Sequence, residues 1–208
     1  VLGKHFPGGS GSPMMVVIAE DSMQAAADVL LDHPFVASVA VVSADSASGT
    51  ATVTRDGIRV FGAPGTPVPQ PTTVDGAVLL QATLNGAADS DEAMSAVREL
   101  RGQLHGLSDT ALVGGVTATA IDTNDASIRD RNLIIPIVLA VIVLILMLLL
   151  RSILAPVLLI ATTVLSFGTA LGVAALVFNN LFSFPGADPA VPLYGFVFLV
   201  ALGIDYNI

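Results

Sequence analysis

Asp205 and Tyr206 are the two residues whose types and setting could perform chemistry in this chain. Asp205 lies near the end of an apolar stretch that begins at Leu193, and no Lys or Arg follows Ser152. A charged carboxylate in hydrocarbon costs at least about 2.5–3.5 kcal/mol, so the group must be protonated, paired or facing a polar pathway. The neighbouring phenol can donate a hydrogen bond to the charged form or accept one from the neutral form. Each option predicts proton or ion handling across a membrane.

Three other interpretations of Asp205 are open. The carboxyl could hold helices together or lie at an aqueous helix end, although intramembrane ionisable residues are functional by default. An intramembrane aspartyl protease needs a second aspartate on a neighbouring helix, usually in Gly-x-Gly-Asp, but residue 201 is Ala and the nearby Asp188 lies in a predicted loop. A lipid-sensing or scaffold protein would keep the same fold without transport.

The sequence lacks the residues needed for thiol chemistry, metal binding and nucleotide binding. The chain has no cysteine, and His5, His33 and His105 are scattered without a carboxylate at metal-ligand spacing. It also lacks the glycine-rich motifs that bind nucleotide phosphates. We therefore expect no cofactor, no metal and no enzymatic activity. The net charge of −9 argues against nucleic acid as a partner, because phosphate binding needs clustered Lys and Arg.

Charge divides the 208 residues into two regions. Residues 1–132 carry seven of the eight basic residues and fifteen of the seventeen acidic ones, whereas the remainder carries only Arg151, Asp188 and Asp205. This division predicts a water-soluble domain over residues 1–131 and a membrane domain over residues 132–208.

The soluble region alternates strand and helix signals. Asp21 or Ser22 can cap the first helix, with Gln24 at the capping-box position if Asp21 is the cap. Ser90 opens the second helix, and Arg98 and Arg101 lie near its end, where positive charge matches the helix dipole. We expect strands at 13–19, 36–42, 78–84 and 111–113, helices at 23–31 and 90–106, and a hairpin within 50–61 that turns at Asp56-Gly57. The order βαβ, hairpin, βαβ predicts an α+β, ferredoxin-like domain. The Gly/Ser run at 8–12 predicts a flexible joint, either an engineered linker or a native hinge.

The second region predicts three membrane-spanning helices, at about 133–150, 157–178 and 193–208, after a polar helix over 117–132. Pro136 falls in the first turn of the first span, and Gly168 and Gly172 form a GxxxG pair suited to close helix packing. The third span is cut short at residue 208, so we expect an internal piece of a longer protein.

Four segments carry a family resemblance. The stretch Leu202-Gly-Ile-Asp-Tyr206 and the loop Phe184-Pro-Gly-Ala-Asp-Pro189 resemble exporters of the mycobacterial-membrane-protein-large family, in the resistance-nodulation-division superfamily. The stretch Asp130-Arg-Asn-Leu-Ile-Ile135 and the opening His5-Phe-Pro-Gly-Gly9 resemble it as well, which favours a native origin for the Gly/Ser joint. The resemblance is strong over residues 122–208 and looser over residues 1–121.

This resemblance implies a protein with twelve membrane helices in two repeats, each repeat with a porter domain outside the cytoplasm. The chain would then be the second porter domain, residues 1–131, and helices eight to ten. Counting Arg129 and Arg131 against Arg151 would place that domain in the cytoplasm, but large domains escape the charge rule. Asp205 and Tyr206 match the family's helix-ten proton relay, whose partner pair belongs to the missing half of the chain. The implied partners are membrane lipids and a hydrophobic or lipid-like cargo carried across the plasma membrane.

Overall fold

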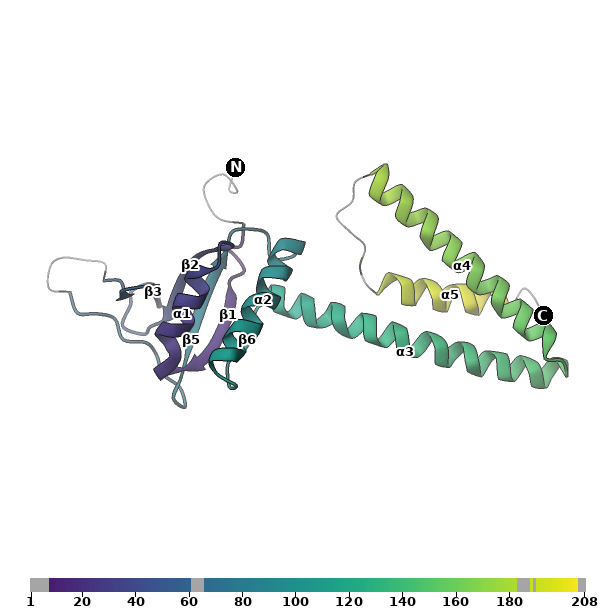
Figure 1. Cartoon of the computed structure of the whole chain (residues 1–208), viewed down its shortest axis with the longest axis horizontal. Helices are drawn as coiled ribbons and strands as arrows, with labels where there is room; N and C mark the ends of the chain where they lie inside the picture. Colours follow the sequence, from purple (N-terminus) through teal and green to yellow (C-terminus); the bar gives the residue numbers. More distant parts are fainter. Residues whose placement is uncertain (1–7, 61–65, 183–187, 189, 206–208) are drawn as a thin grey trace. The chain divides into compact units, whose positions relative to one another are not determined.

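The computed structural model describes residues 8–60, 66–182, 188 and 190–205, with only the backbone described over 199–205 (Figure 1). The chain divides into two compact units, Val1–Asp122 and Thr123–Ile208. Each unit is described separately below.

The first unit combines one sheet with helices. Its described strands are β1 (Met14–Ala19), β2 (Val36–Val42), β3 (Thr50–Thr54), β4 (Gly57–Ile58), β5 (Ala77–Leu84) and β6 (Leu112–Gly114). Its helices are the 3-10 turn η2 (Glu20–Ser22), α1 (Met23–Asp32) and α2 (Asp91–Leu107). Each expected strand and helix of this region is present, with its ends within a few residues of the prediction.

The sheet order is β4-β3-β2-β5-β1-β6, and neighbouring strands pair antiparallel. β5 lies between β1 and β2, so the connection through α1 crosses over β5. The hairpin of β3 and β4 turns at Asp56-Gly57 as predicted, and Gly57 has the positive φ of 109° that such a turn needs. An antiparallel sheet with helices confirms the predicted α+β class.

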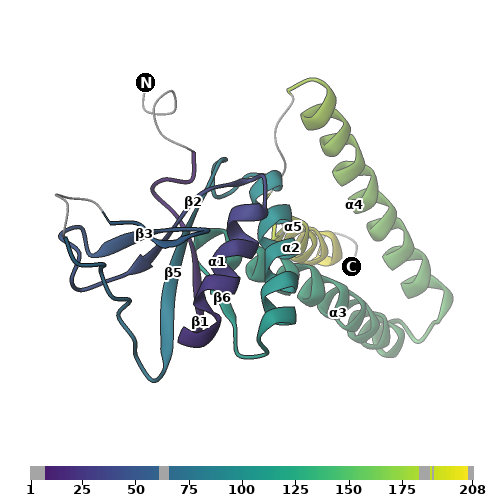
Figure 2. The same ribbon diagram turned by 60° about the vertical axis from the view of Figure 1, so that its left-hand side comes forward.

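One face of the sheet forms the core. Side chains alternate along β5, where Leu80 is fully buried while its neighbours are partly exposed, as period-two geometry requires. α1 and α2 lie side by side over this face (Figure 2). Leu30 of α1 and Leu100 of α2 are fully buried within the same apolar cluster. Burial of this stripe, rather than helix propensity, accounts for most of the stability of such helices.

The two helix starts in this unit differ. Ser90 caps α2 as predicted, because its Oγ accepts a hydrogen bond from Ala93 N at 3.2 Å. The N-cap of α1 is Ser22, and its side chain makes no capping hydrogen bond. Asp21 lies within the preceding 3-10 turn, so the predicted side-chain cap, with a capping box if Asp21 supplied it, was wrong. The Gln24 side chain instead donates to the carbonyl oxygen of Thr54, at 2.9 Å. The same side chain also donates to Oδ1 of Asp28, one turn along α1, at 3.0 Å, so Gln24 contacts both its own helix and the β3–β4 hairpin.

The Gly/Ser run at the start is packed at Gly9, whereas Ser10 and Gly11 of the same run are exposed. Gly9 is buried and its N–H donates to the carbonyl oxygen of Leu84 at 3.1 Å. A Cβ added at Gly9 would come within 2.6 Å of that same oxygen. A flexible joint was therefore the wrong expectation at Gly9. The glycines permit close approach to the end of β5 instead of supplying mobility.

The second unit is helical. Helix α3 (Val116–Leu150) begins in the first unit and continues without a break, and α4 (Leu154–Asn180) and α5 (Val191–Asp205) follow. α3 and α4 are long and apolar enough to cross a membrane, with a mean hydropathy of 3.5 and 2.0 over their most apolar stretches. Pro136 lies in the interior of α3, because the helix starts at Val116 instead of near residue 133. Pro156 falls in the first turn of α4, where the expectation was a turn before the helix.

Candidate functional site

Asp205 occupies the last helical position of α5 in the part of the chain that the structure describes. Its backbone is placed, its side chain is not, and Tyr206 lies outside the described residues. The described helix puts Asp205 about 21 Å along the axis from Val191, at 1.5 Å per residue. The sequence supplies no Lys or Arg after Arg151, so no basic residue of α5 or of the connection before it can neutralise this acid.

An aromatic contact joins α5 to α4. Phe196 is 2% exposed and meets Phe167 edge to face, with ring centroids 5.8 Å apart and planes inclined by 68°. Gly195 lies beside this contact, and a Cβ added there would touch the Phe167 ring at 3.4 Å. Phe196 and Asp205 share α5 and are separated by about 14 Å along it. The helix that carries the acid is therefore held to α4 at its opposite half.

The start of α5 is capped by Asp188. Its Oδ1 accepts a hydrogen bond from Ala190 N at 2.8 Å, and its carbonyl oxygen accepts one from Val191 N at 3.0 Å. This contact confirms the predicted turn-capping role for Asp188. The two nearby acids thus differ in setting, because Asp188 lies in a connection with satisfied local hydrogen bonds and Asp205 lies within an apolar helix.

The GxxxG face of α4 is open. A Cβ added at Gly168 or Gly172 would meet nothing within 4 Å among the described residues. The hydroxyls of Thr162 and Thr169 donate to carbonyl oxygens of their own helix, at 2.9 and 2.8 Å. The predicted close packing of this face is thus not made by any described residue of this chain.

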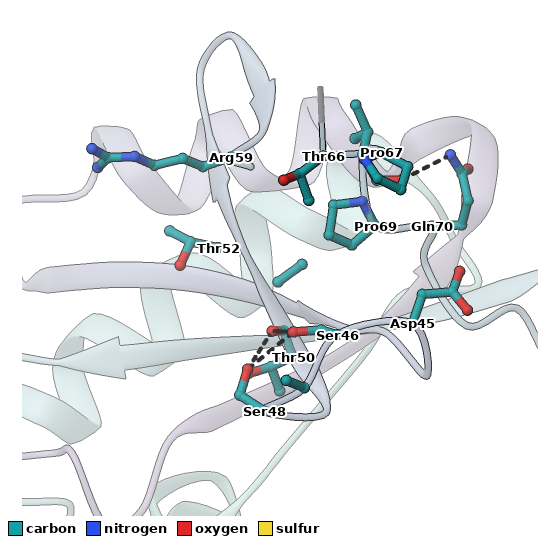
Figure 3. A pocket seen from close by; sticks show the side chains of 13 residues that line it. Asp45, Ser46, Ser48, Thr50, Thr52, Arg59, Thr66, Pro67, Pro69 and Gln70 are labelled. Carbon is teal, nitrogen blue, oxygen red and sulfur yellow. Dashed lines mark hydrogen bonds between the residues drawn. The ribbon is translucent and has the colours of Figure 1, made fainter. Parts of the chain in front are cut away.

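The first unit has a cavity of about 810 Å³ between the β3 region and a proline-rich segment (Figure 3). One wall is fixed by the buried Ser43, whose Oγ donates to the carbonyl oxygen of Gln70 at 2.6 Å. On the other wall, Ser46 and Ser48 both donate to the carbonyl oxygen of Thr50. The described residues that line the cavity are mostly small polar, alanine and proline side chains, together with the acid Asp45 and the base Arg59. None of these described lining residues is aromatic.

The histidines of the first unit have structural partners. His33 Nδ1 accepts from Phe35 N at 3.2 Å, and His105 Nδ1 lies 2.9 Å from the carbonyl oxygen of Arg101. His5 lies outside the described residues. No group of three or more His, Asp or Glu side chains that could hold a metal ion occurs within the described ranges.

Sequence reasoning missed one charged contact, between Arg101 of α2 and Asp122 of α3. Nη1 of Arg101 donates to Oδ1 of Asp122 at 2.8 Å and Nη2 to Oδ2 at 3.3 Å. The hydrogen bonds from Arg101 hold the pKa of the Asp122 carboxyl below its ordinary value, while slight desolvation acts in the opposite direction. In the sequence, Arg101 predicted only a favourable charge near the end of a helix, because its partner lies 21 residues away.

Comparisons with known proteins cover the whole chain. The sequence model of the MMPL family matches residues 1–208. SCO0839 of Streptomyces coelicolor, which is named as a membrane protein, is 49% identical over 208 residues, covering 100% of this chain and 27% of that protein. The chain spans about a quarter of the length of the curated relatives that it matches from end to end.

Two relatives whose names state a cargo match part of the chain. The apo-petrobactin exporter of Bacillus anthracis is 45% identical over 100 residues, which cover 48% of this chain and 14% of that protein. The sulfolipid-1 exporter MmpL8 of Mycobacterium tuberculosis is 36% identical over 134 residues, which cover 62% of this chain and 12% of that protein. Together with the two apolar helices, these relatives assign the chain to a membrane.

Proposed function

Because the chain belongs to the MMPL family, we propose that it forms part of a membrane exporter of lipids or hydrophobic compounds driven by the proton-motive force. The observation that carries the proposal is Asp205 on the apolar helix α5, in a region without basic residues after Arg151. Family membership supports transport, and the isolated acid supports protons as the energy source.

Asp205 is the proton-binding group in this proposal, and Tyr206 is its hydrogen-bonding neighbour. Adjacent residues on a helix point about 100° apart, so each side chain partners groups on another helix. A second Asp-Tyr pair in the missing half of the protein would complete the relay. Gain or loss of a proton at Asp205 would alter how α5 packs, and the contact of Phe196 with Phe167 passes that change to α4.

The architecture in this proposal is a ferredoxin-like porter domain over residues 1–131, outside the cytoplasm, followed by three spans. The strand order β2-β5-β1-β6 with both connecting helices on one face supports the ferredoxin-like arrangement, and the β3–β4 hairpin extends its edge. α5 serves as the third span. Its 15 described residues carry no charged side chain other than that of Asp205, although they are shorter than a full crossing.

The cargo in this proposal is lipid-like or hydrophobic. The names of relatives that export a sulfolipid and apo-petrobactin support a cargo larger and more apolar than an ion. Membrane lipids are the surroundings from which such molecules would be taken. The absence of nucleotide-binding motifs from the sequence is compatible with energy from the membrane gradient.

The test is proton flux through the intact protein in liposomes, reported by the pH-sensitive dye pyranine. Asp205→Asn keeps the size of the side chain but removes proton exchange, so we expect flux and export to be lost while expression and folding stay normal. Asp109→Asn, in an exposed turn of the first unit, is the matched control and retains flux. Flux that survives Asp205→Asn contradicts the proposed relay.

The same preparation separates the alternatives. A lipid-sensing or scaffold protein would show no proton flux in the wild type. An intramembrane aspartyl protease would cleave peptides, and Asp205→Asn would stop the cleavage.

A further inference from the structure

Three elements of the first unit meet at the guanidinium of Arg101. Besides its two hydrogen bonds to Asp122 of α3, Nη2 lies 3.4 Å from the carbonyl oxygen of Val113 in β6 and donates to it. Arg101 itself belongs to α2. Its side chain is 27% exposed, whereas the side chain of Asp122 is 64% exposed. A guanidinium that donates to both oxygens of a carboxylate fixes the relative orientation of the two groups as well as their distance.

This contact lies at the last point where α3 belongs to the first unit. Ala118 and Ile121 are 1% exposed within the core cluster, and Thr117 is 2% exposed. Asp122 is the final residue of the unit. From there to Ile145 every side chain of α3 is at least partly exposed, so no further buried contact fixes the helix over that length.

The turn before α3 is equally constrained. Gly115 has a φ of 104°, and a Cβ added there would lie 2.8 Å from the carbonyl oxygen of Pro13. Its own carbonyl oxygen accepts from Thr119 N at 2.9 Å and so closes the first turn of the helix. The start of α3 is therefore held at both ends, by Gly115 before it and by Arg101 at Asp122.

We propose that Arg101 is a positioning residue that clamps the start of α3 to the first unit, so that movement of the apolar part of α3 is delivered to β6 and α2. The helix is unbroken from Val116 to Leu150. The role in transport rests on the proposed function. The clamp itself does not, because its contacts lie entirely within residues 1–122.

The pKa of Asp122 lies below the ordinary aspartate value, so its carboxylate stays charged at neutral pH. A permanent charge is compatible with this role. The contact between Arg101 and Asp122 therefore persists while Asp205 binds and releases a proton in the proposed function.

The test uses the full-length protein in liposomes and the variant Arg101→Met, which keeps the aliphatic stem and removes the fork. The first readout is hydrogen exchange of the backbone amides of residues 117–122. We expect their exchange to become about three- to fivefold faster, while exchange in β5 stays unchanged. Arg55→Met, which removes the exposed ion pair of Arg55 with Asp32 away from α3, is the matched control and leaves residues 117–122 unchanged.

The second readout is the amount of Nile red exported per proton moved under an imposed pH gradient. We expect Arg101→Met to keep proton flux and to lower this ratio about tenfold, and the exchanged pair Arg101→Asp with Asp122→Arg to restore it in part. A residue with a merely structural role would change the amount of folded protein and leave the ratio alone.

The outcomes separate the two proposals. Unchanged exchange at residues 117–122, or an unchanged ratio in a protein that exports, overturns the clamp. A wild type without proton flux overturns the proposed function, and the exchange readout then still decides whether Arg101 fixes the helix start. If β5 also exchanges faster, Arg101→Lys, which keeps the charge without the fork, replaces the variant and is judged by the same two measurements.

Discussion

The same aliphatic residue types are buried in one unit of this chain and exposed in the other. In the first unit Leu80 and Leu100 are fully buried, whereas in the second unit Leu148 is 73% and Leu165 is 71% exposed. Exposure on this scale, over two consecutive helices, would be unfavourable in water. The first unit therefore packs its apolar side chains against one another, whereas the second unit leaves them exposed, as a helix region located in a membrane can.

Among substitutions that test whether the two units pack their leucines differently, Leu100→Ala is expected to have the largest effect on stability. Loss of a fully buried leucine leaves a cavity, so we expect the first unit to lose about 2–5 kcal/mol of unfolding free energy. Leu148→Ala makes the same chemical change at an exposed position of the second unit and should leave that free energy unchanged. Hydrogen exchange of the β5 amides in the full-length protein measures both. Equal losses would show that the two regions are not packed differently.

A charge placed in the second unit should have the next largest effect. Leu165→Arg puts a guanidinium on an exposed position in the middle of α4, and we expect membrane insertion to cost about 2.5–3.5 kcal/mol. Val68→Arg makes a similar change on an exposed loop of the first unit, where water solvates the charge. The fraction of protein recovered in the membrane measures the difference. Normal insertion of Leu165→Arg would mean that this face of α4 does not meet lipid.

The smallest effect concerns acid and the contact of Arg101 with Asp122. The folded-state pKa of Asp122 is lowered, so its contribution to stability is complete above the ordinary aspartate pKa of about 3.9 and is lost as the pH falls through the lower folded value. The pair is partly exposed, so we expect less than about 1 kcal/mol. Comparing wild type with Asp122→Asn, by β5 exchange across this pH range, isolates the contribution. No difference between them above pH 5 would contradict it.

The sequence predicted the elements of the first unit well because their signals are local. The turn at Asp56-Gly57 and the cap at Ser90 each depend on neighbouring residues. The GxxxG pair also has a local signal, but what it packs against is a property of other helices, and none of the described residues covers it.

The predictions that failed depended on distant parts of the chain. Gly9 was expected to be flexible, and it is packed because Leu84 approaches it from β5. Gln24 was expected at the capping-box position of its helix, and its side chain donates instead to Asp28 of that helix and to Thr54 on a hairpin. Arg101 gave a helix-end signal, while its partner Asp122 follows after a strand and a turn. Asp205 and Tyr206 remain predictions of the sequence and of the family, to be tested by proton flux.

Pro136 has a consequence for how α3 enters the bilayer. Because proline has no amide hydrogen, the carbonyl of Asn132, one turn earlier, loses its usual donor within the helix. Asn132 is the last polar residue before the apolar run, so water or lipid headgroups can supply the missing hydrogen bond there. One turn deeper, an orphaned carbonyl would face only acyl chains. Pro136 thus lies at the junction of the polar and apolar parts of α3, where a carbonyl without its helical donor can still find a polar partner.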